Sequence, residues 1–238
     1  MKKSIIFIVV LALLTLGFTA CEKESEGKTR ITYYAEIILK GDATMVIEKG
    51  SEFKDPGFTA TMKGEDVTEK VKVASDVDTS TSGVYSVNYS IVNEDGFVAS
   101  ATRTVIVMNL SDPVEGFWTV TPESYRDYNG KVVAFGKSFE ILIIGEGDGI
   151  YAVDDLLAGW YCQRAGYGTD YAMQAKIAVA ADGTITLEDS FVQGWGDKAD
   201  YLKDGKFDAD TKTITYDVGY GRPANPMDFY VTLNKVEL

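Results

Sequence analysis

Residues 85–91, Tyr85-Ser86-Val87-Asn88-Tyr89-Ser90-Ile91, alternate between apolar and polar side chains. Successive side chains of a β-strand point to opposite faces, so this period of two predicts a strand with one buried face. A second apolar face of the same kind is formed by Phe97, Ala99, Ala101, Val105 and Val107. Turn-forming residues separate the segments, namely Lys49-Gly50, Asp55-Pro56-Gly57, Ser82-Gly83 and Glu94-Asp95-Gly96. Short strands at this close spacing predict a β-sandwich over residues 31–110.

The same region resembles the bacterial immunoglobulin-like repeats of surface proteins. The resemblance covers about residues 40–108 and is carried by Gly50, Phe53, Asp55-Pro56-Gly57-Phe58, Ala60, Gly83–Tyr89, Asp95-Gly96 and Ala101–Val107. It implies an immunoglobulin-like sandwich, and such modules mostly act as spacers. Arg103 falls among positions whose neighbours are predicted to be buried, so we expect it to pair with a carboxylate at the rim of the sheet.

The rest of the chain predicts a second β-domain. Residues 109–113, Asn-Leu-Ser-Asp-Pro, break the strand pattern and are predicted to form a linker. Asp148-Gly149 and Asp182-Gly183 are hairpin signals. Strands are predicted at 117–121, 131–135, 138–144, 149–153, 171–180, 184–187, 213–218 and 228–236. The expected fold class is therefore all-β, with residues 114–238 forming an antiparallel sandwich or barrel of about eight strands.

The N-terminus predicts export and lipidation. Residues 1–20 combine Met1-Lys2-Lys3 with a short apolar run and small residues, as in a secretory signal peptide. The run is too short to span a bilayer. Thr19-Ala20-Cys21 resembles the lipobox of bacterial lipoproteins, which implies that Cys21 carries the lipid. Residues 21–30 are polar and are predicted to be a flexible tether. Their acidic and lysine residues resemble the surface-export signal of Bacteroidetes lipoproteins, which implies an outer-membrane location facing the cell exterior.

Composition excludes several classes of function. The formal net charge of −13 repels phosphate backbones, so nucleic acid is not an expected partner. The chain contains no histidine, which excludes Ser-His-Asp and Cys-His catalytic arrangements. With Cys21 lipidated, Cys162 has no disulfide partner and is predicted to be a small buried residue. We expect no enzyme, no cofactor and no metal. The residues around Asp208 and Asp210 lack the glycine and glutamate of a calcium loop and instead predict a hairpin turn with Asx hydrogen bonds.

The candidate ligand site lies in the second β-domain, where aromatic residues stand next to glycines. The predicted stacking rings are Trp160, Tyr161, Tyr167 and Trp195, and the predicted hydroxyl partners are Asp154, Asp155 and Arg164. Flat rings beside a few polar groups are what a small-ligand site needs. Large aromatic residues also anchor β cores, and the sequence leaves open whether Trp160 and Trp195 lie in the core or on the surface. Trp118, at the start of the domain, is predicted to be core.

Most of the chain after residue 20 also resembles Bacteroidetes lipoproteins in which an immunoglobulin-like domain precedes a β-domain with a Gly-Trp-Tyr segment, here Gly159-Trp160-Tyr161. Such proteins are often encoded with glycan-uptake systems. The resemblance implies a non-catalytic, carbohydrate-binding accessory at the cell surface, with a polysaccharide or oligosaccharide and outer-membrane uptake proteins as partners. The alternative is a structural or assembly component whose aromatic residues pack against an outer-membrane partner protein.

Overall fold

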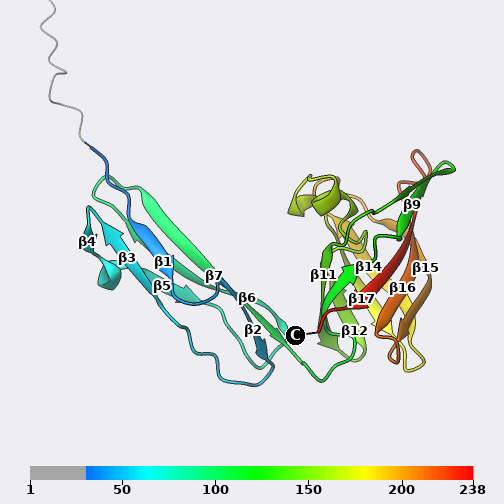
Figure 1. The fold of residues 1–238 in the computed structure, drawn as a ribbon, viewed down its shortest axis with the longest axis horizontal. Helices are drawn as coiled ribbons and strands as arrows, with labels where there is room; N and C mark the ends of the chain where they lie inside the picture. Colours follow the sequence, from blue (N-terminus) through cyan, green and yellow to red (C-terminus); the bar gives the residue numbers. More distant parts are fainter. Residues whose placement is uncertain (1–30, 238) are drawn as a thin grey trace, which may run out of the picture.

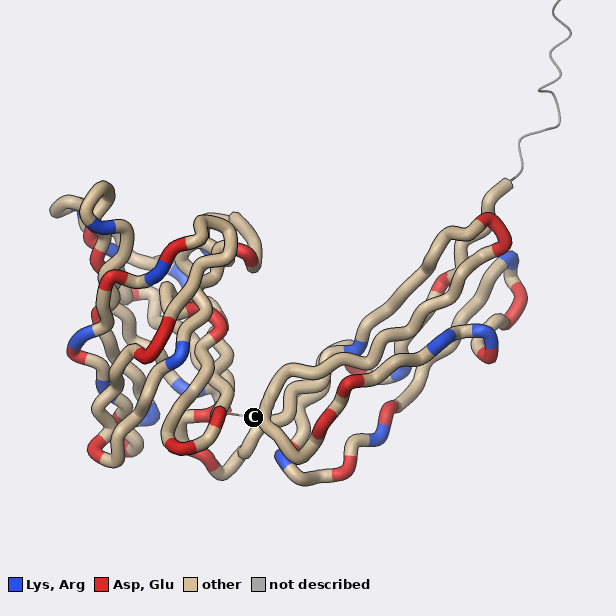
Figure 2. The backbone as a smooth tube through the Cα atoms, turned by 180° about the vertical axis from the view of Figure 1, so that it is seen from behind, with Lys and Arg blue, Asp and Glu red and all other residues tan. Residues whose placement is uncertain are grey.

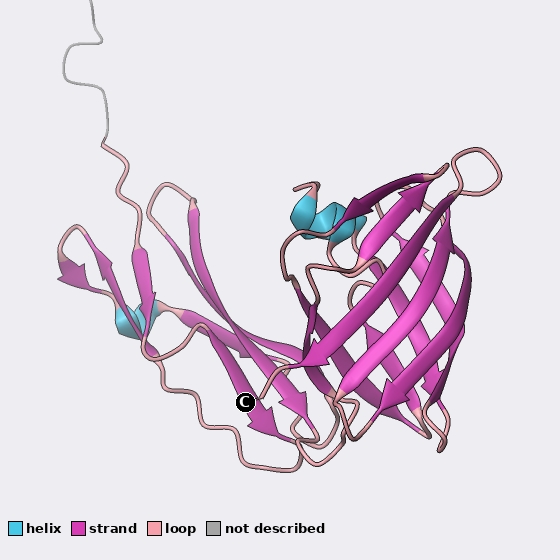
Figure 3. Ribbon diagram, turned by 45° about the vertical axis from the view of Figure 1, so that its right-hand side comes forward, coloured by secondary structure: helices cyan, strands magenta, loops and turns pink. Residues whose placement is uncertain are grey.

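The computed structural model describes residues 31–237. The predicted signal peptide, the predicted lipidation site Cys21 and the predicted tether lie outside this range. The described residues form two β-domains, which make the two arms of an open V (Figure 1). Strands dominate both arms and the helices are short (Figure 3), so the prediction of an all-β chain is confirmed. Within the described range, no helix is both long and apolar enough to cross a membrane.

The first arm is the predicted immunoglobulin-like sandwich. One sheet has the order β1-β3-β4 and the other β2-β7-β6-β5, with β2 parallel to β7. The longest pairing joins β6 and β7 as an antiparallel hairpin. The elements are β1 (Glu36–Leu39), β2 (Thr44–Glu48), β3 (Phe58–Met62), β4 (Glu65–Asp66), η2 (Thr68–Lys70), β5 (Lys72–Ser75), β6 (Gly83–Val92) and β7 (Val98–Met108).

The alternation along β6 places its apolar residues as predicted. Val87, Tyr89 and Ile91 are buried between the sheets, as are Val105 and Val107 of β7. Phe97 differs from the prediction, because it lies just before β7 and is 49% exposed, with its ring 5.5 Å from that of Tyr34.

Among the described residues of this domain, Arg103 is the one charged residue that is buried, with an exposure of 0%. As predicted, it pairs with a carboxylate, since its Nε lies 3.1 Å from Oδ1 of Asp55. Its terminal nitrogens donate to backbone carbonyls, including that of Lys40 at 2.8 Å. Burial raises the pKa of Asp55, but the Gly57 N–H, the Tyr89 hydroxyl and the Arg103 guanidinium together lower it below its ordinary value.

The second arm is a closed barrel, which decides between the two predicted architectures. Eight strands follow one another around it in the order β8-β11-β12-β13-β14-β15-β16-β17, and β17 pairs back onto β8. The hairpin of β9 and β10 extends beside the first half of β17. The strands are β8 (Gly116–Val120), β9 (Tyr125–Tyr128), β10 (Lys131–Ala134), β11 (Glu140–Gly147), β12 (Ile150–Val153), β13 (Met173–Val179), β14 (Thr184–Val192), β15 (Ala199–Asp208), β16 (Thr213–Tyr220) and β17 (Met227–Lys235).

Apolar side chains fill the barrel. Trp118 is 0% exposed, as predicted, and its ring lies edge-on to that of Phe207 at 6.2 Å. Two strands were not predicted, β9 and β15. The Lys203–Lys206 stretch of β15 carries the turn-like pair Asp204-Gly205, yet the strand continues through it with a shift in register. The predicted turn at Asp208 is confirmed, because its carboxylate accepts the N–H groups of Asp210 and Thr211 at 2.9 and 3.1 Å.

The two arms meet at a packed junction. Ile106 and Met108 of β7 form an apolar cluster with Ile144 of β11. The carboxylate of Asp112 accepts the N–H groups of Val114 and Glu115 at 2.8 and 3.1 Å, which fixes the predicted linker as a turn. Basic and acidic residues are both scattered over the two arms (Figure 2).

Arg103→Met should destabilise the immunoglobulin-like domain by about 3–5 kcal/mol, because it leaves buried carbonyls and the Asp55 carboxylate without their donor. The measurement is hydrogen exchange of the backbone amides of β6 and β7. Glu94→Gln, which removes an exposed ion pair to Lys63, is the control and should change stability by less than about 0.5 kcal/mol. Equal exchange in the two variants would contradict this role of Arg103.

Candidate functional site

The candidate residues other than Asp154 gather at the free end of the barrel, away from the linker. Pro113 of the linker and the adjacent Val114 line one pocket together with the turn at 180–183 and residues 206–209 at the end of β15, so these segments mark the linker end of the barrel. Up-and-down strands bring the alternate connections to the opposite end. There lie residues 154–172, which carry the two short helical turns, together with residues 193–198 and 221–226 (Figure 3).

Asp155 organises the longest of these connections. It is 2% exposed, and its carboxylate accepts the N–H groups of Leu157, Gly159 and Met173, each at 3.0 Å. The Sγ of half-buried Cys162 donates to the same carboxylate at 3.0 Å. Burial raises the pKa of Asp155, and these four donors oppose that rise. The prediction that Asp155 contacts a ligand is therefore corrected, since its oxygens hold the loop.

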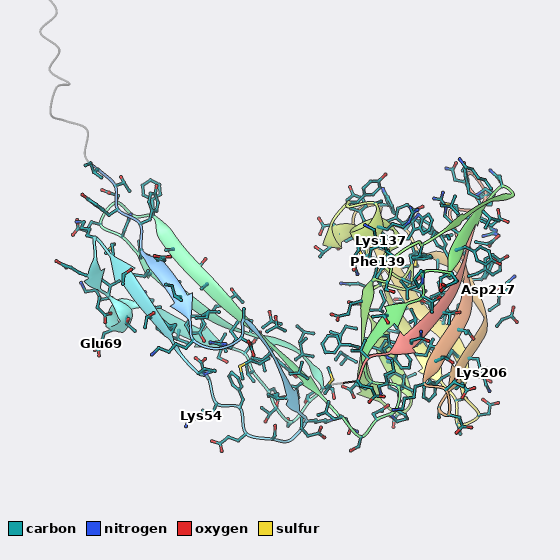
Figure 4. The ribbon with its side chains drawn as sticks, viewed as in Figure 1. Lys54, Glu69, Lys137, Phe139, Lys206 and Asp217 are labelled. Atoms are coloured by element: carbon teal, nitrogen blue, oxygen red, sulfur yellow. The ribbon has the colours of Figure 1, made fainter. Side chains whose placement is uncertain are left out.

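A π-helical turn, η3 (Trp160–Arg164), follows this anchor and directs the aromatic side chains. It begins after Gly159, whose φ of 83° lies in the left-handed region. A Cβ atom at Gly159 would come within 2.7 Å of Phe139, which Figure 4 labels beside this loop, so both backbone shape and space require glycine. A single π-turn of this kind shifts the direction in which successive side chains point.

The structure places Trp160 in the core. It is 3% exposed, and the rings of Phe135 and Phe229 meet it edge-on at 4.9 and 5.7 Å. The guanidinium groups of Arg126 and Arg164 lie over its ring at 4.7 and 4.2 Å. Trp160 is therefore covered on its faces and edges, and the expectation of an exposed stacking ring is corrected for this residue.

Arg164 also has a structural task. Besides stacking on Trp160, it donates from Nε to the carbonyl of Phe135 at 3.1 Å and from Nη2 to that of Ala134 at 3.3 Å. These contacts tie η3 to the end of β10. The predicted hydroxyl partner is thus engaged with the protein at two of its nitrogens.

The other three predicted rings come together, although they are far apart in sequence. The ring of Trp195 lies 4.7 Å from that of Tyr161 and 6.2 Å from that of Tyr167. Two residues outside the predicted set complete the cluster, Tyr171 at 4.8 Å and Tyr220 at 6.0 Å from Trp195. We call these five residues the aromatic platform.

The platform presents two of its rings to solvent. Tyr167 is 56% exposed and Trp195 is 40% exposed, while Tyr161 and Tyr171 are half-buried and Tyr220 is buried. Gly194 allows this packing, because a Cβ atom there would lie 2.6 Å from the ring of Tyr171. The exposed rings are thus supported from below and from the side by other rings.

Two aspartates lie next to residues of the platform. Asp197 accepts the Tyr220 hydroxyl at 2.9 Å, which raises the pKa of Tyr220 in addition to the larger effect of burial. Asp170 lies in the 3-10 turn η4 (Thr169–Tyr171), and its carbonyl accepts the Gly194 N–H at 2.7 Å. Hydrogen-bond acceptors beside exposed rings suit a ligand that carries hydroxyl groups.

Asp154, the remaining predicted residue, is not part of the platform. It lines a groove on the side wall of the barrel, and one of its oxygens accepts the Leu142 N–H at 2.9 Å. Asp154 and Asp155 therefore face opposite sides of the barrel wall, as adjacent strand residues do. Across residues 31–237, no group of three acidic or cysteine side chains is arranged to hold a metal ion.

Each of the two domains matches a known family of protein domains. A family model described as a bacterial surface protein, Ig-like domain, matches residues 37–107, and a model of a family of C-terminal domains matches residues 107–235. The crystal structure of the lipoprotein BT2262 from Bacteroides thetaiotaomicron is 40% identical in sequence, with a TM-score of 0.73, and the match covers 85% of this chain and 100% of that one. The chain belongs to the BT2262 family. The predicted resemblance to Bacteroidetes surface lipoproteins is thereby confirmed.

Two structures of ZmpB from Clostridium perfringens also align with the chain. One, its M60 catalytic domain with CBM51-1 and CBM51-2, has a TM-score of 0.26 and 19% identity over 84% of this chain and 21% of that chain. The other, CBM51-2 in complex with GlcNAc and INT domains, has a TM-score of 0.25 and 16% identity over 83% and 44%. No curated protein matches the chain. The chain thus shares its fold with a lipoprotein, and its first domain matches a bacterial surface Ig-like domain.

Asp155→Ala should destabilise the barrel by about 3–5 kcal/mol, because three buried N–H groups lose their acceptor. Urea unfolding followed by tryptophan fluorescence measures this, since all three tryptophans lie in the barrel. Glu188→Gln, an exposed change on β14, is the control and should lie within about 0.5 kcal/mol of the wild type. A loss below about 1 kcal/mol for Asp155→Ala would refute the anchoring role.

Proposed function

We propose that this protein is a lipid-anchored, non-catalytic carbohydrate-binding accessory of a glycan-uptake system at the outer membrane. In this proposal Cys21 carries the lipid, the immunoglobulin-like domain is the spacer, and the aromatic platform binds the sugar. The observation that carries the proposal is the pair of exposed rings, Tyr167 and Trp195, held at the free end of the barrel.

The packing of the platform supports binding. Tyr161 and Tyr171 contact the ring of Trp195 at 4.7 and 4.8 Å and so restrict its rotamers before any ligand arrives. Less side-chain entropy is then lost on binding, so more of the stacking energy contributes to affinity. A pyranose presents a flat face of C–H groups that fits such rings, and Asp170 and Asp197 lie nearby as acceptors for its hydroxyl groups.

The charge around the platform indicates which sugars fit. Asp197 is hydrogen-bonded to Tyr220 of the platform, and Asp170 directly precedes Tyr171. Arg164 is engaged with Trp160 and two carbonyls. The chain as a whole carries a formal net charge of −13. An uncharged glycan is therefore favoured over one rich in uronate or sulfate, which these carboxylates repel.

A second candidate function is assembly with an outer-membrane partner protein. The free end of the barrel and the end of the first arm where residue 31 begins lie on the same side of the junction (Figure 1). That arrangement brings the platform to the side from which the chain enters, where it could contact a membrane-embedded partner. Binding of glycans to the platform distinguishes the carbohydrate proposal from this one.

Trp195→Ala and Tyr167→Ala should each weaken binding to a retained neutral polysaccharide by about tenfold, about 1.4 kcal/mol, through loss of a stacking ring. Affinity electrophoresis against a panel of neutral and acidic polysaccharides measures this. Phe97→Ala removes an equally exposed ring from the first arm and should leave retention unchanged. Retention of no glycan by the wild type would favour the assembly function.

Cys21→Ala should move the protein from the membrane fraction to the soluble fraction, because the substitution removes the thiol that is proposed to carry the lipid chains. Lasting membrane attachment needs more than one such chain. Mass spectrometry of residues 21–30 from membranes should show a diacylglycerol adduct on the wild-type chain. An unmodified Cys21 in the membrane fraction would disprove the anchor.

A further inference from the structure

A groove of about 430 Å³ lies where the two arms of the V meet. Val84 of β6 contributes the wall on the first arm, and the outer faces of β11, β12, β13 and β14 contribute the rest. It lies on the side wall of the barrel and is lined by none of the five platform residues. The volume lies within the range of small-ligand sites.

The walls of this junction groove are largely apolar. Leu142, Ile144 and Ala152 form its floor on the barrel. Val84 and Phe191 line it while remaining 56% and 41% exposed, so each arm contributes an apolar side chain that the fold itself leaves uncovered. An alkyl chain placed there would remove apolar surface of both arms from water.

The charge within the groove is negative. The two lysines beside it are already paired, Lys176 with Glu146 at 2.7 Å and Lys198 with Asp189 at 2.7 Å. Asp154 has instead the carboxylates of Asp155 and Glu140 as its charged neighbours. Asp154 keeps an exposed surface that a ligand can reach, yet the surrounding protein desolvates it and raises its pKa to about 6. A cation beside Asp154 would stabilise its ionised form, which burial and the neighbouring carboxylates both disfavour.

We propose that the junction groove binds a lysine side chain from a partner protein, with the ammonium on Asp154 and the alkyl stem between Val84 and Phe191. A lysine carries its charge at the end of a four-carbon apolar stem, which matches a largely apolar groove in which Glu146 and Asp189 are paired with lysines and Asp154 is the carboxylate left for a ligand. The formal net charge of −13 favours a basic partner in the same way. This site is independent of the aromatic platform and of the glycan proposed there.

The test uses two peptides, Ac-Leu-Lys-Leu-NH₂ and its norleucine analogue, which keeps the stem and removes the charge. Both are titrated into the ¹⁵N-labelled full chain, and the amide signals of Val84, Ala152 and Gln174 are followed by NMR. The lysine peptide should shift signals from both arms. The norleucine peptide should bind at least tenfold more weakly.

Two variants test the assigned contacts. Asp154→Asn retains an acceptor for the Leu142 N–H and should weaken binding of the lysine peptide at least tenfold, and Phe191→Ala should weaken it several-fold. Their matched controls are Asp148→Asn on the far turn of β12 and Val132→Ala, an apolar residue that is 60% exposed on β10. Neither control should change the affinity.

The pH dependence follows from the same carboxylate. Asp154 is neutral below a pH of about 6 and then no longer attracts an ammonium group, so affinity should fall as pH is lowered from 8 to 5. Glu140, Glu146, Asp155, Asp189, Lys176 and Lys198 are the other charged groups around it. Equal binding of the two peptides, or unchanged binding in Asp154→Asn, would overturn the proposal.

Discussion

The pairing of β17 is the constraint on which the barrel and its site depend. Along its length β17 binds β16 on one side, and on the other it binds β9 first and β8 afterwards. This double pairing closes the sheet and leaves the interior to be filled by side chains such as Trp118 and Phe229. The up-and-down order of the strands puts residues 154–172, 193–198 and 221–226 at one end of the sheet, and closure of the barrel gathers these connections around that end.

In both domains, polar side chains inside the fold stabilise the backbone, whereas the exposed aromatic rings of the described residues make no such contacts with it. Asp155 accepts backbone N–H groups from Leu157 and Gly159 of one connection and from the start of β13. Arg164 links the same connection to the end of β10. Arg103 does comparable work in the first arm, where its guanidinium joins Asp55 to backbone carbonyls. Each of these side chains satisfies buried donors or acceptors that would otherwise cost free energy. The rings of Tyr167 and Trp195 are exposed instead, so their surfaces are accessible to a ligand.

The two surfaces discussed above differ in chemistry and position. The aromatic platform is a group of rings flanked by acceptors at the free end of one arm. The junction groove is largely apolar, contains the carboxylate of Asp154, and lies mainly on the barrel wall, where Val84 of the first arm completes its lining. We propose that the aromatic platform binds sugars and that the junction groove binds a basic protein segment.

The sequence by itself determined the all-β class, the immunoglobulin-like first domain, the core position of Trp118 and the pairing of Arg103 with a carboxylate. Local alternation, turn residues and the cost of burying a charge are visible along the chain and lead to these conclusions, except that the immunoglobulin-like character of the first domain was implied by its resemblance to bacterial surface repeats. Tertiary structure alone decided that the second domain closes into a barrel, that Trp160 is core while Trp195 is exposed, and that Asp155 is an anchor. Trp160 and Tyr161 are adjacent aromatic residues after the same glycine, so the sequence does not distinguish them. The π-turn η3 and the rings packed against them place Trp160 in the core and Tyr161 in the platform. Tyr171 and Tyr220 joined the platform for the same reason: the contacts that make them neighbours of Trp195 cross the barrel end, and residue spacing does not encode that distance.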